Sequence, residues 1–600
     1  MPVTSEQYQP TALPPGAAAP GAAARAARAR RPRADPNKVG VVLIHGIGTQ
    51  KASETLLDWT RPVVGLLADW RRDHGFDVDP VRRSQYSFSG ASLPFLELEI
   101  PASGDHPAQT WVVTEAWWAT QMRPPKLSDV TGFLRHGLPR IARGIRAGYD
   151  EREDAWQGRV EQERTAAGRR AAQGAPDQTP TADAEQAQAA LVEHTLAAAG
   201  RWSWIRLLDS IQKWLTGLAL TPVVLLGTLV LAIYAPFRAI PFKPLRDLAV
   251  LREADNFFVH WIGELPTLLG DPVQSANVRA RAAEAIEGLE RQGCGRIVIV
   301  AHSGGAIVSF TTLLDPVYLE RKVDKLITIG EGLGLAWHLV DRNQLLDRGN
   351  RLAGDLAATR PDLVWYDYWA SYDPAPGGPL RHPRGLPLPV TSRPITNRMS
   401  IFEDHGSYWE NDEGFLVALI RHLDTAGGRP DDGPGSRFFP DGGHRAVLIE
   451  RRRQRVGVLA LWRWLAVLAA GVPIVLGTVL AAPGRGPAAA GRAAAAFWDT
   501  VPAHEVVSVP VSWLAGIVNG PSWAATVGEW SFGAILVGVL FLIVGLIGIR
   551  WWEAWDGRER RIAHSSVLLP VDRRGAALSG TVLVLLTALL SGFVTRSLIG

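Results

Sequence analysis

Ser303 has the surroundings of a serine that can act as a nucleophile. An apolar run at 297–300 precedes it, the sequence Ala-His-Ser-Gly-Gly spans 301–305, and a helix-compatible stretch follows. A serine on a sharp turn between a strand and a helix exposes its hydroxyl oxygen. Such a turn needs small residues two positions before and after the serine, because the two backbones approach closely there. The pattern therefore predicts nucleophilic attack by Ser303, with Ala301 where glycine is usual.

An earlier segment contains a loop suited to stabilising negative charge. The apolar run 39–44 is typical of a buried strand and ends in His-Gly-Ile-Gly at 45–48. When a nucleophile attacks an acyl group, two backbone N–H groups must point at the oxygen that gains charge. We expect these groups to belong to Ile47 and Gly304, since glycines let the loop bend toward a substrate. The other residues of the loop and the turn are His45, Gly46, Gly48, His302 and Gly305, and the two histidines are expected to shape the pocket.

With these two motifs, residues 38–425 resemble the α/β-hydrolase superfamily, and most closely its lipase and esterase branch. The resemblance implies an α/β fold with a mostly parallel sheet and helices on both faces. It also implies hydrolysis of carboxylic esters by a serine, an acid and a histidine that follow one another along the chain. An acyltransferase or thioesterase with the same three residues, or a non-catalytic hydrolase-like scaffold, are the alternatives.

The resemblance assigns the acid to Asp373. This residue ends the aromatic run 363–373 and precedes a proline, which is where lipase-like hydrolases carry the carboxylate that orients the histidine. Glu331, just after an earlier strand, is the main competing carboxylate, and Asp367 is another.

The expected base is His405. It lies in a polar, glycine-containing loop before a helix of apolar periodicity, so it is free to reach across the strand ends to Ser303. His382, in a loop rich in proline and arginine, and His422, within the helix, are the alternatives.

The composition limits the other classes of function. The chain has 600 residues, enough for one catalytic domain and additions, and its 47% hydrophobic content is high for a soluble enzyme of this size. Cys294 is the single cysteine, so no disulfide can form within the chain. The sequence contains no metal-ligand cluster, no phosphate-binding glycine loop followed by lysine and no nucleic-acid motif. We therefore expect no metal, no cofactor and no nucleic-acid partner.

The chain divides into four parts by composition. Residues 1–37 form a basic tail rich in alanine, proline and glycine that is expected to be disordered. The catalytic domain is expected at 38–425, with an insertion or cap at 120–255. A linker at 426–455 leads to a membrane domain at 456–600.

Three segments of the membrane domain are expected to be transmembrane helices. Residues 464–482, 532–549 and 577–594 contain no charge and approach the ~20 residues that a spanning helix needs. Arginines flank the spans on one side, with Arg451, Arg452, Arg453 and Arg455 before the first. This bias predicts a multi-pass protein of the cytoplasmic (inner) membrane whose catalytic domain faces the cytoplasm.

A fourth apolar segment, 214–237, constrains the topology. It lies between the strands at 39–44 and 297–300, and a single crossing would place two strands of one sheet on opposite sides of the membrane. We therefore expect either an anchor in the cytoplasmic leaflet or a lid over the site, and favour the anchor. The expected partners are the membrane and a lipid or acyl-ester substrate, and the oligomeric state is left open.

Overall fold

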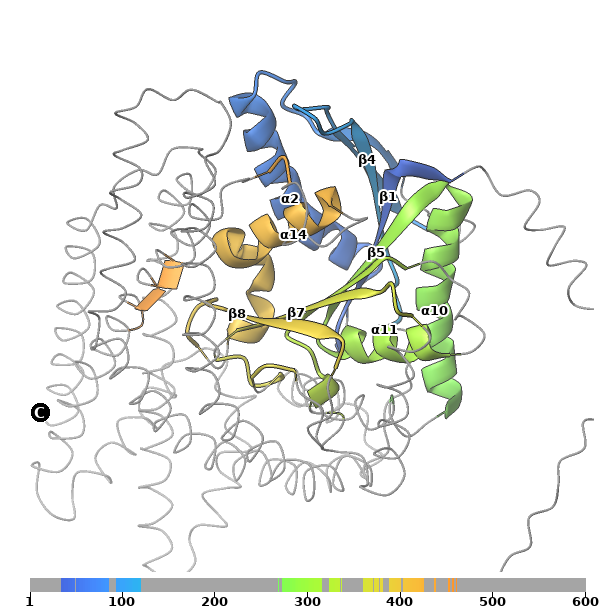
Figure 1. Ribbon diagram of the computed structural model, residues 1–600. Helices are drawn as coiled ribbons and strands as arrows, with labels where there is room; N and C mark the ends of the chain where they lie inside the picture. The colour runs from blue at the N-terminus through green and yellow to red at the C-terminus, as the bar shows by residue number, and fades with distance from the viewer. Residues whose placement is uncertain are drawn as a thin grey trace, which may run out of the picture.

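In the computed structural model of the protein, an eight-stranded sheet forms the centre (Figure 1). The strand order is β2-β3-β4-β1-β5-β6-β7-β8. Neighbouring strands are parallel except in the pairs β2–β3 and β3–β4, which are antiparallel. The strands are β1 (Asp35–Ile44), β2 (Val81–Gln85), β3 (Phe95–Ile100), β4 (Gln109–Glu115), β5 (Cys294–His302), β6 (Lys325–Ile329), β7 (Val364–Ala370) and β8 (Val390–Ile395).

The structure describes part of the chain. The described residues are 34–119 without 49 and 86–92, 268, 272–315, 323–336 without 335, 360–425 without 371, 377, 381–387 and 401–402, 436–438, and 452, 453, 456, 457 and 460. The predicted tail up to 33, the insertion 120–255 with its segment 214–237, and the three predicted spans lie outside them. Among the described residues, no helix has both the length and the apolar character needed to span a membrane.

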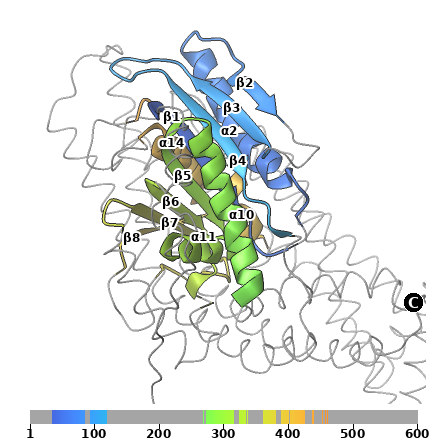
Figure 2. The same ribbon diagram turned by 90° about the vertical axis from the view of Figure 1, so that its right-hand side faces the viewer.

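Helices cover both faces of the sheet. On one face lie α2 (Glu54–Asp73) and α14 (Val417–Asp424), and on the other lie α10 (Pro272–Arg291) and α11 (Gly304–Leu314), which Figure 2 shows in front of the strands. Alternation along β1 explains the two layers: Val41 and Leu43 pack with α2, whereas Val42 and Ile44 pack with α10 and α11. The predicted α/β class with a mostly parallel sheet and helices on both faces is confirmed at this level.

β3 and β8 were not among the strands predicted from the sequence, although the alternation Phe-Leu-Glu-Leu-Glu-Ile in β3 is typical of a strand. Val-Thr-Ser-Arg-Pro-Ile in β8 lacks an apolar run and contains Pro394. A proline cannot donate to a strand ladder, and it is tolerated here because β8 lies at the edge of the sheet. Only the neighbouring β7 gives this segment its strand conformation.

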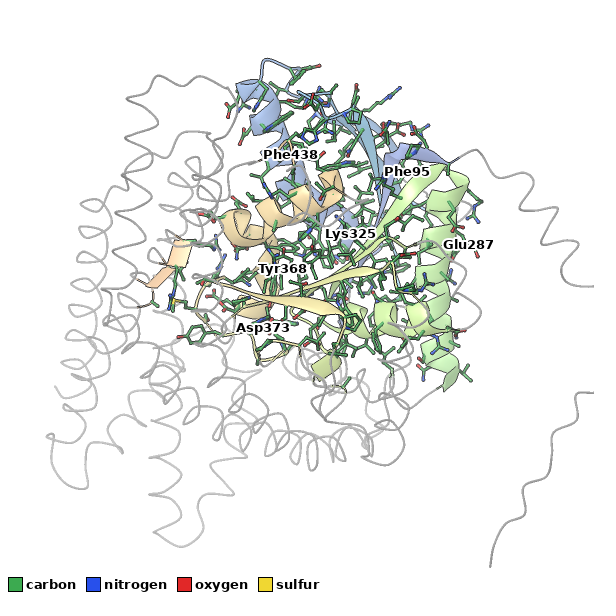
Figure 3. All side chains as sticks on the ribbon, viewed as in Figure 1. Phe95, Glu287, Lys325, Tyr368, Asp373 and Phe438 are labelled. Atoms are coloured by element: carbon green, nitrogen blue, oxygen red, sulfur yellow. The ribbon has the colours of Figure 1, made fainter. Side chains whose placement is uncertain are left out.

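Two predicted boundaries need correction. β1 begins at Asp35, so residues 35–37 of the predicted tail belong to the sheet. The predicted linker 426–455 is also partly integrated into the domain. The carboxylate of Asp424 accepts hydrogen bonds from Ser436 Oγ and from Arg437 N and Nε. Phe438, which Figure 3 labels near α2 and α14, packs its ring 4.7 Å from that of Trp70. A buried aromatic and a paired arginine dock this segment on the domain.

The chain order places a topological switch point at the carboxyl end of β1. β1 lies between β4 and β5. After β1 the chain first forms β2, β3 and β4 on one side of it, and then β5 to β8 on the other side. The chain leaves β1 for α2 on one face of the sheet and leaves β5 for α11 on the other, and ligands of open α/β sheets bind at such a switch point. The loop 45–48 and Ser303 both lie there.

Candidate active site

Ser303 occupies a strained turn between β5 and α11. Its φ of 55° and ψ of −123° are a backbone conformation that residues other than glycine rarely adopt. Backbone hydrogen bonds hold it: Ser303 N donates to Ile329 O at 3.1 Å, and Ser303 O accepts from Gly332 N and from Ala306 N, each at 3.1 Å. Backbone strain of this kind persists only where the surrounding structure holds the residue in place. The strained conformation turns the Ser303 side chain away from the strand.

Glycine is needed around this turn because the loop after β1 approaches it closely. A Cβ on Gly305 would lie 2.4 Å from Ile44 O, and one on Gly46 would lie 2.6 Å from Ser303 Cβ. A Cβ on Gly304 would meet the Ile47 side chain at 2.6 Å and lie 3.3 Å from Ile47 N. The backbone amides of Ile47 and Gly304 are therefore neighbours beside Ser303.

His405 connects Ser303 to Asp373. Its Nε2 lies 3.0 Å from Ser303 Oγ, and its Nδ1 lies 2.9 Å and 3.0 Å from the two carboxylate oxygens of Asp373. These partners assign the proton to Nδ1, which donates to the carboxylate and leaves Nε2 to accept from the serine hydroxyl. The histidine lies on the short helical turn η3 (Asp404–Gly406). The structure thus brings these three predicted residues into one hydrogen-bonded array.

The carboxylate of Asp373 is fully buried yet favours its charged form. Burial raises its pKa, but the charge and hydrogen bond of His405 oppose this. Ala375 N donates to Oδ1 at 2.8 Å, and the Tyr408 hydroxyl donates to Oδ2 at 2.7 Å. Together these groups hold the pKa of Asp373 below its usual range.

The competing carboxyls have other partners. Asp367 accepts from the hydroxyls of Thr328 and Ser392, and Glu331 accepts from Gly334 N at 3.0 Å. Burial, followed by the charge of Asp367, raises the pKa of Glu331 well above 4.5. This favours the neutral form of Glu331, and a neutral carboxyl cannot stabilise an imidazolium by charge.

The alternative histidines do not meet Ser303 in the described structure. His422 lies within α14, and its Nε2 is 2.7 Å from the hydroxyl of Tyr368. His382 lies outside the described residues.

His45 and His302 are held neutral by their surroundings. Burial lowers the pKa of His45 to about 4 and that of His302 to about 3. Nδ1 of His45 donates to Gly46 O at 2.7 Å, and its Nε2 accepts from Trp118 N at 3.1 Å. His302 Nε2 donates to His405 O at 2.8 Å. Both rings therefore hold backbone groups of the site in place.

Residues at the end of β4 and just after it hold the loop after β1, and sequence reasoning missed them. Trp118 donates from Nε1 to His45 O at 3.1 Å and stacks on the His45 ring, with 4.8 Å between the ring centroids. Trp117 Nε1 donates to Gln50 O at 2.8 Å. The Glu115 carboxylate accepts from Leu56 N at 3.1 Å and from the backbone N of Ser53. The only local signal was a pair of tryptophans directly after a strand.

Asp404, beside the histidine, was also missed. Its buried carboxylate accepts from the backbone N–H groups of Tyr372, Arg398 and Ser400. Burial raises its pKa to about 6 against these hydrogen bonds. Asp404 thereby joins the histidine loop to the turn that carries Asp373, and no sequence pattern indicates this.

The described residues do not indicate a resident metal, because no three or more His, Cys, Asp and Glu side chains among them form a group that could hold one.

Comparison of the chain with models of known protein families, with curated proteins and with solved structures finds no match. The geometry of the site is therefore what indicates the function of the chain.

Proposed function

We propose that this protein is a serine hydrolase of the α/β-hydrolase type that cleaves carboxylic esters. The observation that carries the proposal is the continuous array from Ser303 Oγ to His405 Nε2 at 3.0 Å and from His405 Nδ1 to Asp373 at 2.9 Å. A nucleophile, a base within hydrogen-bonding distance and a group that orients the base are the parts that covalent acyl transfer requires.

In the first half-reaction, Ser303 Oγ attacks the ester carbonyl carbon while His405 Nε2 accepts its proton. Asp373, held ionised, stabilises the imidazolium. The N–H groups of Ile47 and Gly304 donate to the tetrahedral oxyanion. The intermediate then expels the alcohol, which takes the proton from His405, and leaves an acyl group on Ser303.

In the second half-reaction, water replaces the alcohol. His405 accepts a proton from the water as it attacks the acyl carbon, and a second tetrahedral intermediate forms. Its collapse returns that proton to Ser303 and releases the carboxylic acid. His45 and His302, both neutral, take no proton in either half and keep the loop and the histidine in position.

The location of this activity is part of the proposal. The three apolar segments of 456–600 and their flanking arginines support attachment to the cytoplasmic membrane, with the hydrolase domain on the cytoplasmic side. A lipid or an acylated molecule is the substrate class that an enzyme so attached would meet.

The test compares Ser303→Ala with Ser309→Ala in the full chain. Ser309 lies in α11, and its Oγ donates to Gly305 O at 2.7 Å, so this control also removes a nearby hydroxyl. We expect wild type and Ser309→Ala to hydrolyse a p-nitrophenyl ester and to react with a fluorophosphonate probe, and Ser303→Ala to do neither. Undiminished labelling of Ser303→Ala, or no labelling of the wild type, would overturn the proposal.

A further inference from the structure

Arg452 is a buried arginine from the far end of the predicted linker. It is 6% exposed and lies in a helical turn. Its Nη1 pairs with the Glu413 carboxylate at 2.7 Å, and its Nε donates to Thr396 O at 2.7 Å. Nη1 and Nη2 also donate to Glu410 O at 3.4 Å and Asn397 O at 3.2 Å. A guanidinium presents its donors in a fixed plane, so these contacts define where the acceptors lie.

The acceptors of Arg452 belong to the loop that carries His405. Thr396 O also accepts from Asn411 Nδ2, and Asn397 Nδ2 donates to Asp404 O at 2.7 Å. Asp404 directly precedes the histidine, and its carboxylate accepts hydrogen bonds from the backbone N–H groups of Arg398 and Ser400. The contacts therefore run from Arg452 through Asn397 and Asp404 to the residue whose Nε2 faces Ser303.

A second buried arginine of the predicted linker provides a comparison. Arg437 is 7% exposed, and its Nε pairs with Asp424 at 2.9 Å. Its Nη groups donate to Pro101 O and Pro107 O, in the connection between β3 and β4. The two arginines thus have the same kind of ion pair and carbonyl partners, but only Arg452 bonds the histidine loop.

We propose that Arg452 is a positioning residue for His405, so that the chain beyond residue 438 completes the catalytic geometry as well as leading to the membrane segments. This inference rests on the proposed function, since it gives Arg452 a role in that reaction. Arg452 brings a positive charge into a buried site. Glu413 neutralises this charge, and the carbonyl groups of 396–397 accept its hydrogen bonds, only when the histidine loop has the described conformation. Loss of the guanidinium leaves Glu413 buried without this partner and releases the loop.

The experiment measures steady-state hydrolysis of a p-nitrophenyl ester and hydrogen exchange on full-length Arg452→Ala, Arg452→Lys and Arg437→Ala in detergent. Each rate is divided by the fraction of the protein that is folded. Displacement of a catalytic group can cost on the order of 10²-fold, so we expect Arg452→Ala to lose about that much kcat with little change in KM. Arg452→Lys should be intermediate, because an ammonium keeps the charge but not the planar set of donors. Peptides covering 396–411 should exchange faster in Arg452→Ala than in the wild type.

Arg437→Ala is the matched control. It removes an ion pair that is at least as buried, so it should lower stability at least as much as Arg452→Ala while kcat and the exchange of 396–411 stay near the wild type. Equal losses of kcat in both alanine variants, or unchanged kcat and exchange in Arg452→Ala, would refute the positioning role. If the wild type neither hydrolyses the ester nor binds the probe, the proposed function fails by itself. Hydrogen exchange still decides whether Arg452 orders the histidine loop.

Discussion

The hydroxyl of Tyr408 donates a 2.7 Å hydrogen bond to Asp373 Oδ2 and accepts one of 2.9 Å from Ala370 N. Ala370 ends β7 and Asp373 lies in the turn after it, so one side chain from the histidine loop fixes both ends of this turn. Burial and then the charge of Asp373 raise the pKa of Tyr408 well above 10.0. Tyr408 therefore remains a donor to the carboxylate across the working pH range.

The first prediction concerns Tyr408→Phe. The change removes one donor from Asp373 and leaves Ala370 N buried without this acceptor, so we expect stability to fall by about 1–3 kcal/mol. A loss of about 1.4 kcal/mol of transition-state stabilisation would lower kcat about tenfold. Thermal unfolding and ester hydrolysis measure the two effects. Tyr368→Phe is the control, because its hydroxyl pairs with His422, away from the triad. Equal kcat in the two variants would contradict the role of Tyr408.

The second prediction separates the two candidate acids. Asp373→Asn keeps the shape of the side chain but loses the charge and disturbs the tautomer of His405, so we expect kcat to fall by about 10⁴-fold. Glu331→Gln replaces a carboxyl whose neutral form is already favoured, and kcat should stay close to that of the wild type. Ester hydrolysis by both variants decides between them. The reverse order of activities would assign the acid to Glu331.

The third prediction concerns stability as the pH rises. The folded-state pKa of Glu331 lies well above 4.5, so the folded protein binds this proton more tightly than the unfolded chain does. The resulting stability is fully present below about pH 4.5, the unfolded pKa, and is lost as the pH rises through the folded value. Asp367 and Asp404, each raised to about 6, contribute with the same sign.

Glu331→Gln tests this linkage, because glutamine keeps the size of the protonated acid and cannot ionise. Melting temperatures of wild type and variant are compared at pH 5 and pH 8. We expect the variant to lose less stability between the two values. An identical change in both proteins would show that Glu331 does not contribute.

The fourth prediction concerns the loop after β1. Trp118→Phe removes the indole N–H that donates to His45 O and keeps a ring against the imidazole. A released loop positions the Ile47 amide less well, and we expect kcat to fall about tenfold, equivalent to about 1.4 kcal/mol. Trp111→Phe is the control. Trp111 lies within β4, ahead of Trp118 in the chain, and the change removes the 3.0 Å bond to Gln109 Oε1 far from the loop. A fall in kcat in the control alone would contradict this assignment.

The fifth prediction concerns the membrane topology. In a Cys294→Ser background, an impermeant thiol reagent added to intact cells should label Ala488→Cys, between the first two predicted spans. It should not label Ala563→Cys, between the second and third, until the cells are opened. Labelling of both or neither in intact cells would contradict the predicted orientation.

The sequence by itself determined the α/β class, because apolar runs, strand-ending glycines and helix periodicity are local properties that do not depend on the rest of the chain. The small residues around Ser303 and the glycines of 45–48 were readable for the same reason. Their requirement for close backbone approach appears in the structure at Gly46, Gly304 and Gly305, where a Cβ would lie within 2.6 Å of another atom.

Only the tertiary structure decided which distant groups meet. Ser303 and His405 are 102 residues apart, and the choice of Asp373 rather than Glu331 beside the imidazole depends on the order of β5, β6 and β7. Arg452 shows the limit most clearly: in the sequence it belongs to an arginine cluster before a predicted span, whereas in the structure it is buried against Glu413. Burial and pairing arise from packing between distant segments, and local composition does not specify that packing.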